Sequence, residues 1–374
     1  MEHSISRVVE NGDAMAAVWR GGEETSLPYL WLRDNCGCSE CRVVQTTEKR
    51  FHIFRVAREI RPRQVAIECP GRDDEALAIV WPDGHRTRYG SGELRRLAGQ
   101  PHRTPDHVQH WDSSFQPRRY DFSRFLRDDR TAADLIEEFL ATGACVLVDA
   151  PTEPDSSEQL TARLGPLREV VFDRIHNVVV DPKGYSIAHT DLAIAPHNDF
   201  TSYSWPPSVQ VLHMLANECD GGESSIVDGF RVLDGLRREH PGLFDVLCTV
   251  PVPFRLASEH DESYAVNPMV ELDGEGNVRL LRFNTQQMKT VPLAEHRLGA
   301  FYAAYHELST RVNAAGSQVS LRLGAGQVLL IAAHRVLHGR TALGSGGRRH
   351  LQDAYFEHDN VRNHLALLRR TGRI

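Results

Sequence analysis

The sequence of 374 residues lacks any run of about 18 apolar residues, the length that a membrane-spanning helix requires. Its opening stretch, MEHSISRVVENGD, also lacks the apolar core of a secretory signal, so we expect a cytoplasmic protein with no membrane partner. Basic residues are in deficit, because 43 Lys and Arg face 50 Asp and Glu and the net charge is -7. Since neutralising phosphates needs a basic surface, we expect no nucleic acid among the partners.

Cysteine is scarce and odd in number, with seven in the chain, which argues against a framework of disulfides. Three of them, Cys36, Cys38 and Cys41, fall within one short segment, a spacing that indicates metal binding in a reducing compartment. A tetrahedral zinc site needs a fourth ligand, and His85 in WPDGHRTRY is the candidate. Four protein ligands leave no open position, so we expect a structural zinc. The other cysteines are expected to be small buried side chains: Cys69, Cys145, Cys219 and Cys248.

No long helical pattern occurs in residues 1–95, where short apolar segments such as 65–69 and 76–81 alternate with Gly, Pro and Asp turns. We expect a small β-rich zinc-binding domain there. The polar stretch 99–117 carries three prolines, which favours a linker over 96–120. The catalytic domain is then expected over 121–374.

The second domain shows many strand patterns and few helices. A capping box from Thr131 to Asp134 predicts a helix that stops at Gly143, and a second helix is predicted over 295–314. The expected strands cover 144–150, 208–215, 224–230, 318–323 and 327–333. A mainly β fold with flanking helices follows, either a sandwich or a barrel, and a jelly roll is one such solution.

The segment APHNDF places His197 and Asp199 two residues apart, so in an extended chain both side chains lie on one face and can chelate one metal. His338 in HRVLHGR is the candidate third ligand. Two histidines and one carboxylate would leave octahedral positions open for a bidentate cosubstrate and O2, the arrangement of non-heme Fe(II) enzymes.

Other histidine motifs compete with this interpretation. The motif from His189 to Asp191 has the same H-x-D spacing, so a single match is weak. His334 and His338 form H-x-x-x-H, but Arg335 stands where a zincin carries its glutamate, which excludes that protease.

A longer series of segments carries a family resemblance: WLRDNCGCSEC, APHNDF, PPSVQVLHML, GGESSIVDGF, NPMVELDGEGNVRLLRFN, HRVLHGR and GRRHLQDAYFEHD. With them nearly the whole chain resembles the γ-butyrobetaine and trimethyllysine hydroxylase branch of the Fe(II)/2-oxoglutarate-dependent dioxygenases, which includes 2-(trimethylammonio)ethylphosphonate hydroxylase. The resemblance implies a double-stranded β-helix (jelly roll) catalytic domain and an N-terminal zinc domain. It also implies a homodimer, with ascorbate as a possible reductant.

The resemblance further assigns roles to particular residues. Fe(II) is expected on His197, Asp199 and His338, so that His189 and Asp191 are not ligands. Arg349, in an Arg-His-Leu motif, is expected to bind the C5 carboxylate of 2-oxoglutarate through its planar guanidinium, with Arg348 as the rival. Ser224 is expected to contact the same carboxylate. The zinc ligands match Cys36, Cys38, Cys41 and His85.

A trimethylammonium group donates no hydrogen bond, so aromatic faces are expected to hold it through cation–π attraction. The aromatic candidates are Phe172, Phe200, Tyr203, Trp205 and Tyr355. The chain departs from the γ-butyrobetaine pattern where His176 and His189 stand for cage aromatics and Ser186 for an asparagine, while Asn284 is retained. Because Arg174, His176 and His189 suit a dianion, we favour 2-(trimethylammonio)ethylphosphonate as substrate, with γ-butyrobetaine as the alternative.

Three other classes remain open. They are a non-catalytic cupin-like binder of small molecules, a zinc hydrolase that uses the same triad, and a chain whose only metal is structural zinc.

Overall fold

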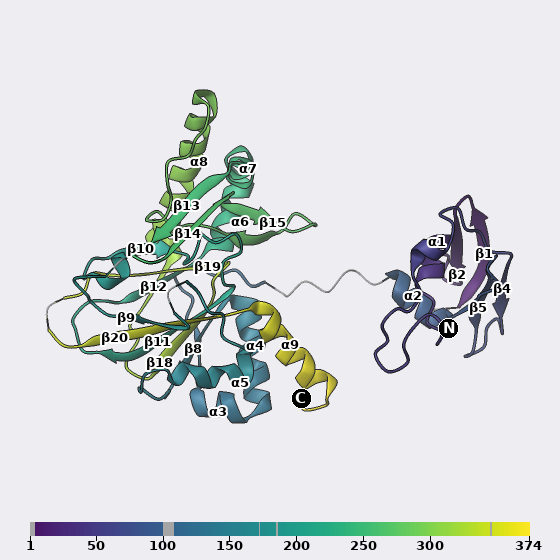
Figure 1. The fold of residues 1–374 in the computed structure, drawn as a ribbon, viewed down its shortest axis with the longest axis horizontal. Coiled ribbons are helices and arrows are strands. Elements are labelled where there is room, and N and C mark those ends of the chain that lie inside the picture. The colour runs from purple at the N-terminus through teal and green to yellow at the C-terminus, as the bar shows by residue number, and fades with distance from the viewer. Residues whose placement is uncertain (1–3, 100–107, 172, 185, 345) are drawn as a thin grey trace. The chain divides into compact units, whose positions relative to one another are not determined.

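The computed structural model describes residues 4–99, 108–171, 173–184, 186–344 and 346–374 (Figure 1). It divides into two compact units, Met1–Pro105 and Asp106–Ile374. Helix α2 (Ser91–Gly99) extends into the expected linker from one side, and Trp111 is buried in the core of the second unit on the other. The folded units therefore take in both ends of the segment 96–120 that the sequence indicated as linker.

The first unit contains two antiparallel three-stranded sheets. One consists of β1 (Ile5–Asn11), β2 (Ala14–Trp19) and β3 (Glu24–Pro28), and the other of β4 (Gln64–Glu68), β5 (Ala76–Val80) and β6 (Arg86–Gly90). The short helix α1 (Tyr29–Asp34) and a 3-10 turn, η1 (Ile53–Arg55), lie between them in the chain. Buried side chains of both sheets, such as Trp19 and Ile79, share one core with Leu32 of α1.

The second unit is built on two sheets. The larger has the strand order β7 (Arg118–Asp121), β8 (Ala144–Val148), β18 (Gln327–Ala332), β11 (Val209–Asn217), β20 (Arg349–Phe356) and β9 (Ile175–Val178). The smaller has the order β10 (Ile194–His197), β19 (Val336–Arg340), β12 (Ser224–Asp228) and β17 (Gln318–Leu321). Apart from the parallel pair β7 and β8, the strands within these sheets pair antiparallel. The mainly β jelly-roll fold expected from the sequence is confirmed.

Strand β18 shows why its sequence is a continuous apolar run. Side chains alternate between the faces of a strand, so Val328 and Leu330 enter one core while Leu329 and Ile331 enter another. The first core lies under helices, and the second contains residues of both sheets. Because β18 is covered on both faces, every position along it favours an apolar residue.

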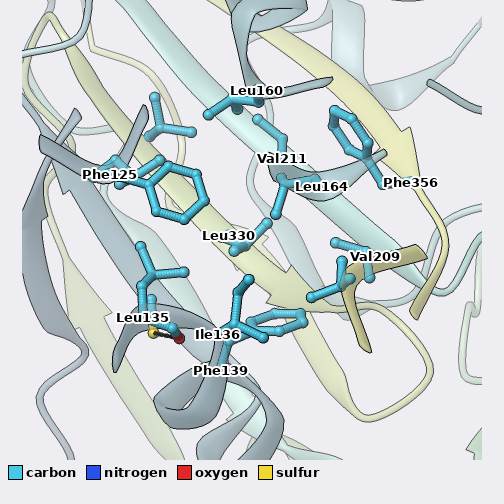
Figure 2. Close-up of a cluster of buried hydrophobic side chains, with 14 of the residues drawn as sticks. Phe125, Leu135, Ile136, Phe139, Leu160, Leu164, Val209, Val211, Leu330 and Phe356 are labelled. Carbon is cyan, nitrogen blue, oxygen red and sulfur yellow. Dashed lines mark hydrogen bonds between the residues drawn. The ribbon is translucent and has the colours of Figure 1, made fainter. Parts of the chain in front are cut away.

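Helices cover one face of the larger sheet (Figure 2). They are α3 (Phe122–Arg127), α4 (Asp129–Thr142), α5 (Thr161–Leu164), which follows the 3-10 turn η2 (Ser156–Leu160), and the C-terminal α9 (His358–Arg370). Figure 2 shows Ile136 and Phe139 of α4 directed toward Val209 and Leu330 of the sheet. Helix α4 starts earlier than predicted, because Asp128 rather than Thr131 caps it, its carboxylate accepting a hydrogen bond from the Thr131 amide. Gly143 ends it in the left-handed conformation, as predicted.

A third cluster of helices and hairpins follows β12. It comprises α6 (Gly229–Glu239), α7 (Pro241–Thr249), α8 (Glu295–Asn313), the hairpin β13 (Val252–Ala257) with β14 (Glu262–Asn267), and the hairpin β15 (Val270–Leu272) with β16 (Val278–Leu281). The remaining turns are η3 (Ile187–His189) and η4 (Ala315–Ser317). None of the helices in the described segments combines the length and apolar character needed to cross a bilayer.

Candidate active site

The smaller sheet brings two distant histidines side by side. His197 ends β10, His338 lies in β19, and the two are direct partners in the antiparallel register. Their rings lie 4.4 Å apart between centroids. Gly339 permits this close approach, because a Cβ there would lie 2.5 Å from the carbonyl oxygen of Ile194 in β10.

Asp199 completes the group from a turn. Strand β10 ends at His197, and the next residues leave the extended conformation, with Phe200 at a φ of 52°. This differs from the extended H-x-D segment assumed from the sequence, yet the carboxylate still faces both rings. His197 Nε2 lies 3.3 Å from Asp199 Oδ1, and His338 Nε2 lies 3.7 Å from Asp199 Oδ2. One ligand atom from each of the three residues falls within 4.8 Å of the others.

Asn198, between the two ligands, holds this turn in place. Its side chain donates to the carbonyl of Ala333 at 2.7 Å and accepts from the amide of Phe283 at 2.9 Å. Asn284 donates to the backbone carbonyl of Asn198 at 2.9 Å, and its own side-chain oxygen accepts from the amides of Gln286 and Gln287. Asn284, expected to bind substrate, therefore already uses both ends of its side chain to position the turn.

The protonation states of His338 and Asp199 suit metal binding, whereas Asp199, against the effect of burial, raises the pKa of His197, which gives up a proton when it binds a metal. Burial lowers the pKa of His338 to about 4, so this imidazole is neutral at pH 7. Although burial alone would raise it, the two imidazoles hold the pKa of Asp199 well below its usual value. The Nδ1 atom of His197 lies 3.0 Å from the carbonyl of Ala195, a contact that directs its Nε2 toward the other ligands. A neutral imidazole and an ionised carboxylate are the forms that bind a metal, so the donor set fits a two-histidine, one-carboxylate iron site.

Arg349, at the start of β20, has the features of an anion site. No hydrogen bond or ion pair joins its guanidinium to another described residue, and its Nε is buried without a partner. Burial lowers its pKa, and Arg349 lies close enough to Arg340, another buried cation, to add to the effect of burial in lowering the pKa of Arg340. Arg349, Arg348 and Asp191 line a cavity of about 540 Å³. A buried cation without a counter-ion fits a bound carboxylate.

Ser224 follows a loop that approaches this arginine. It is 6% exposed at the start of β12, where it pairs with Arg340. Two residues earlier, Gly222 has a φ of 63° and sits against Arg349, so that a Cβ there would lie 3.4 Å from the guanidinium Nε. The loop before β12 therefore approaches Arg349 as the expected cosubstrate contact requires.

A cavity of about 330 Å³ opens beside the triad. His197 and Asp199 line it, and so do four of the predicted substrate residues: His176, Phe200, Asn284 and Tyr355. Phe200 and Tyr355 meet at 87° with their ring centroids 5.1 Å apart. The cavity wall also includes the exposed side chains of Arg255 and Lys289, which sequence reasoning missed.

The structure corrects the expectation for Arg174. Its guanidinium is exposed and bonds to Glu158 at 2.6 Å and Glu169 at 3.2 Å, so its charge is already balanced outside the cavity. His189 is buried with its ring 5.3 Å from that of His176, and Tyr203 packs behind Phe200 at 4.9 Å, but neither lines the cavity. Trp205, 43% exposed, stacks edge-on against His334 rather than entering the cavity. Phe172 lies outside the described residues.

Two further residues at the site, Gln210 and Asp353, were missed. Gln210 of β11 donates to Asp199 Oδ2 at 2.7 Å, and Asp353 of β20 lines the cavity at 5% exposure. The hydroxyl of Tyr355 lies 3.0 Å from Asp199 and 2.9 Å from Asp353, with one proton to donate between two carboxylates. Strand alternation was the available signal for Asp353, because it is two residues from Tyr355 and four from Arg349 on one face of β20.

The predicted zinc ligands also converge, within the first unit. The Nε2 atom of His85 lies 3.3 Å from Cys36 Sγ, 3.7 Å from Cys38 Sγ and 3.4 Å from Cys41 Sγ. Tetrahedral bonds of about 2.3 Å to sulfur and 2.0 Å to nitrogen place such atoms roughly 3.5 Å apart. Glu40 lies 3.3 Å from Nδ1 of His85 and can fix its ring. The four side chains fit a closed zinc site.

Comparison with known proteins agrees with this geometry. Residues 102–355 match the model of the taurine catabolism dioxygenase TauD, TfdA family. The chain belongs to this family of dioxygenases. Residues 7–95 match the γ-butyrobetaine hydroxylase-like N-terminal family. The predicted membership of the γ-butyrobetaine hydroxylase-like dioxygenases is confirmed.

Curated relatives of the family cover nearly the whole chain. The γ-butyrobetaine dioxygenase of Pseudomonas sp. (strain AK-1) is 30% identical, over 95% of this chain and 94% of the relative. The human γ-butyrobetaine dioxygenase is 28% identical over 97% and 96%. The mitochondrial trimethyllysine dioxygenase of Gallus gallus is 27% identical over 91% and 82%. Among solved structures, an asparagine oxygenase with Fe(II) matches 63% of this chain and 77% of its own at a TM-score of 0.46 and 19% identity.

Proposed function

We propose that this dioxygenase hydroxylates a small acid that carries a trimethylammonium group, with 2-oxoglutarate as cosubstrate. The observation that carries the proposal is the convergence of His197, Asp199 and His338 beside a cavity that the first two residues line. The curated relatives, named for γ-butyrobetaine and trimethyllysine, support the trimethylammonium group.

In the proposed enzyme His197, Asp199 and His338 hold Fe(II). When bound, ferrous iron and 2-oxoglutarate supply the oxidising chemistry, in which O2 and the keto acid yield succinate and CO2 while a C–H bond of the substrate becomes C–OH. Arg349, assisted by Ser224, binds the far carboxylate of 2-oxoglutarate, which orients its keto acid end. Gln210 and Tyr355 donate to Asp199 and keep the ligand carboxylate in one orientation.

The substrate is proposed to occupy the 330 Å³ cavity with its ammonium group at the rings of Phe200 and Tyr355. We keep 2-(trimethylammonio)ethylphosphonate as the favoured substrate and γ-butyrobetaine as the alternative. Arg174 no longer supports this preference, and Arg255 on the cavity wall is likewise paired, with Glu262 at 2.8 Å. Lys289 on the same wall supports an acidic group in the substrate.

The test is substrate-dependent succinate formation by the full chain with Fe(II), ascorbate and O2. Turnover of the phosphonate above γ-butyrobetaine is expected, and His197→Ala should abolish it. Binding without succinate would favour the cupin-like binder, activity that persists with Zn(II) alone would favour a hydrolase, and one metal per chain would leave only structural zinc. Preferential turnover of γ-butyrobetaine would overturn the phosphonate assignment alone.

A further inference from the structure

Asp353 is a buried carboxylate on the wall of the proposed substrate cavity. It is 5% exposed, and its Oδ2 accepts from the hydroxyl of Tyr355 at 2.9 Å. Its Oδ1 is buried and accepts no hydrogen bond within the described part of the chain. The Nδ1 atom of His176 lies 3.6 Å from that oxygen, beyond direct hydrogen-bond distance.

A buried carboxylate in this position lowers the stability of the fold unless a cation compensates its charge. Asp199 adds a second negative charge nearby, joined to Asp353 through the shared Tyr355 hydroxyl. Iron would neutralise Asp199, since that residue belongs to the triad, but Asp353 lies outside the triad. The cavity therefore retains a negative group that its walls satisfy only in part.

We infer that Asp353 is the counter-ion for the ammonium group of the substrate and determines the preference for a cation. This rests on the proposed function. The rings of Phe200 and Tyr355, set at 87° to one another, give the methyl groups two aromatic faces beside the carboxylate. Among the described aromatic residues that were expected to surround the ammonium group, only these two line the cavity. The carboxylate of Asp353 therefore contributes part of the binding of the ammonium group.

Charge recognition differs measurably from recognition of shape. The trimethylammonium group of γ-butyrobetaine and the tert-butyl group of its carbon isostere 5,5-dimethylhexanoate have the same shape, but only the former is cationic. Both should be titrated by calorimetry into the full chain loaded with Fe(II) and 2-oxoglutarate without oxygen. Wild type should bind the ammonium more tightly by on the order of 10- to 100-fold, and Asp353→Asn should remove most of that ratio while it leaves the Kd of the isostere within about threefold.

The matched control is Asp155→Asn, because Asp155 is an exposed carboxylate that bonds to Gln352, the neighbour of Asp353 in the strand. It should keep the wild-type ratio. Equal loss of affinity for both ligands in Asp353→Asn would leave the ratio unchanged and indicate a structural role. The charge-retaining Asp353→Glu should restore part of the ratio that Asp353→Asn loses. An unchanged ratio in Asp353→Asn, or no preference for the ammonium in wild type, would overturn the inference. Selective binding without succinate formation would instead count against the proposed function alone.

Discussion

Replacing Arg349 by Gln should separate the binding of cosubstrate from the stability of the fold. In the absence of 2-oxoglutarate, Arg349 is a cation with a buried Nε, no counter-ion among the described residues and Arg340 as a neighbour. An uncompensated buried charge destabilises a folded protein, so its removal should leave the unliganded enzyme as stable as before or more stable. Replacing most other side chains that are this enclosed would instead lower the stability of the protein.

The loss should appear in the affinity for 2-oxoglutarate. Hydrogen bonds to a charged group contribute about 1.5–3 kcal/mol, and a bidentate guanidinium–carboxylate pair belongs to the strong end of such contacts. At 1.4 kcal/mol per tenfold, the apparent KM for 2-oxoglutarate should rise by roughly 10- to 150-fold. The KM for the ammonium substrate should change little, because Arg349 does not line that cavity.

Thermal unfolding with and without 2-oxoglutarate, without oxygen, measures both effects in one experiment. Wild type should be stabilised by the ligand, and Arg349→Gln should lose that stabilisation. The adjacent Arg348→Gln is the control, since Arg348 is exposed and contacts His350. A lower unfolding temperature of unliganded Arg349→Gln together with an intact response to 2-oxoglutarate would refute the assignment and leave Arg349 a structural residue.

Three further outcomes test the fold and its metal. Cys41→Ser should remove zinc, as measured by elemental analysis, and abolish the unfolding transition of the first unit while the second unit unfolds as in the wild type. The reason is that closed zinc sites contribute folding free energy directly. A normal transition of the first unit without zinc would contradict this. Arg335→Met should cost about 3–5 kcal/mol in urea unfolding, because it removes the arginine that now pairs with buried Asp228 at 2.8 Å and leaves that charge to backbone amides and His110. A loss below 1 kcal/mol would be inconsistent with this. Burial lowers the pKa of His213 to about 4, so between pH 6.5 and pH 4 the unfolded chain binds a proton that the folded chain does not. The free energy of unfolding should therefore fall by up to roughly 3 kcal/mol as the pH drops from 6.5 to 4. His213→Leu should flatten that slope, and an unchanged slope would show that His213 is protonated in the folded state.

Three strands of the larger sheet, β8, β11 and β18, were predictable because burial of a strand favours apolar residues along it. The expected strands at 144–150 and 327–333 correspond to β8 and β18, and the helix expected over 295–314 is α8, Glu295–Asn313. The N-terminus of α4 was misplaced because Asp128 and Thr131 are both good caps, and only the backbone decides which one accepts the amide bond.

The metal ligands were accessible for a different reason. Two of them lie in one short motif, but His338 is 139 residues beyond Asp199, and no local pattern joins them. The pairing of β10 with β19 does so, and only the family resemblance anticipated it. Arg174 was misjudged because its partners Glu158 and Glu169 come from other segments, and a sequence does not show which charges are already balanced.

Strand β20 relates the two proposed ligand sites to each other. Arg349, Asp353 and Tyr355 share one face, since side chains two and four residues apart in a strand point the same way. At about 3.3 Å per residue, Arg349 and Asp353 are roughly 13 Å apart along the strand. One strand thus presents a cation for the dicarboxylate at one end and an anion for the ammonium at the other, with Tyr355 reaching the ligand Asp199. Because β20 pairs with β11 on one side and β9 on the other, a one-residue shift of its register would turn all three side chains away from their sites together.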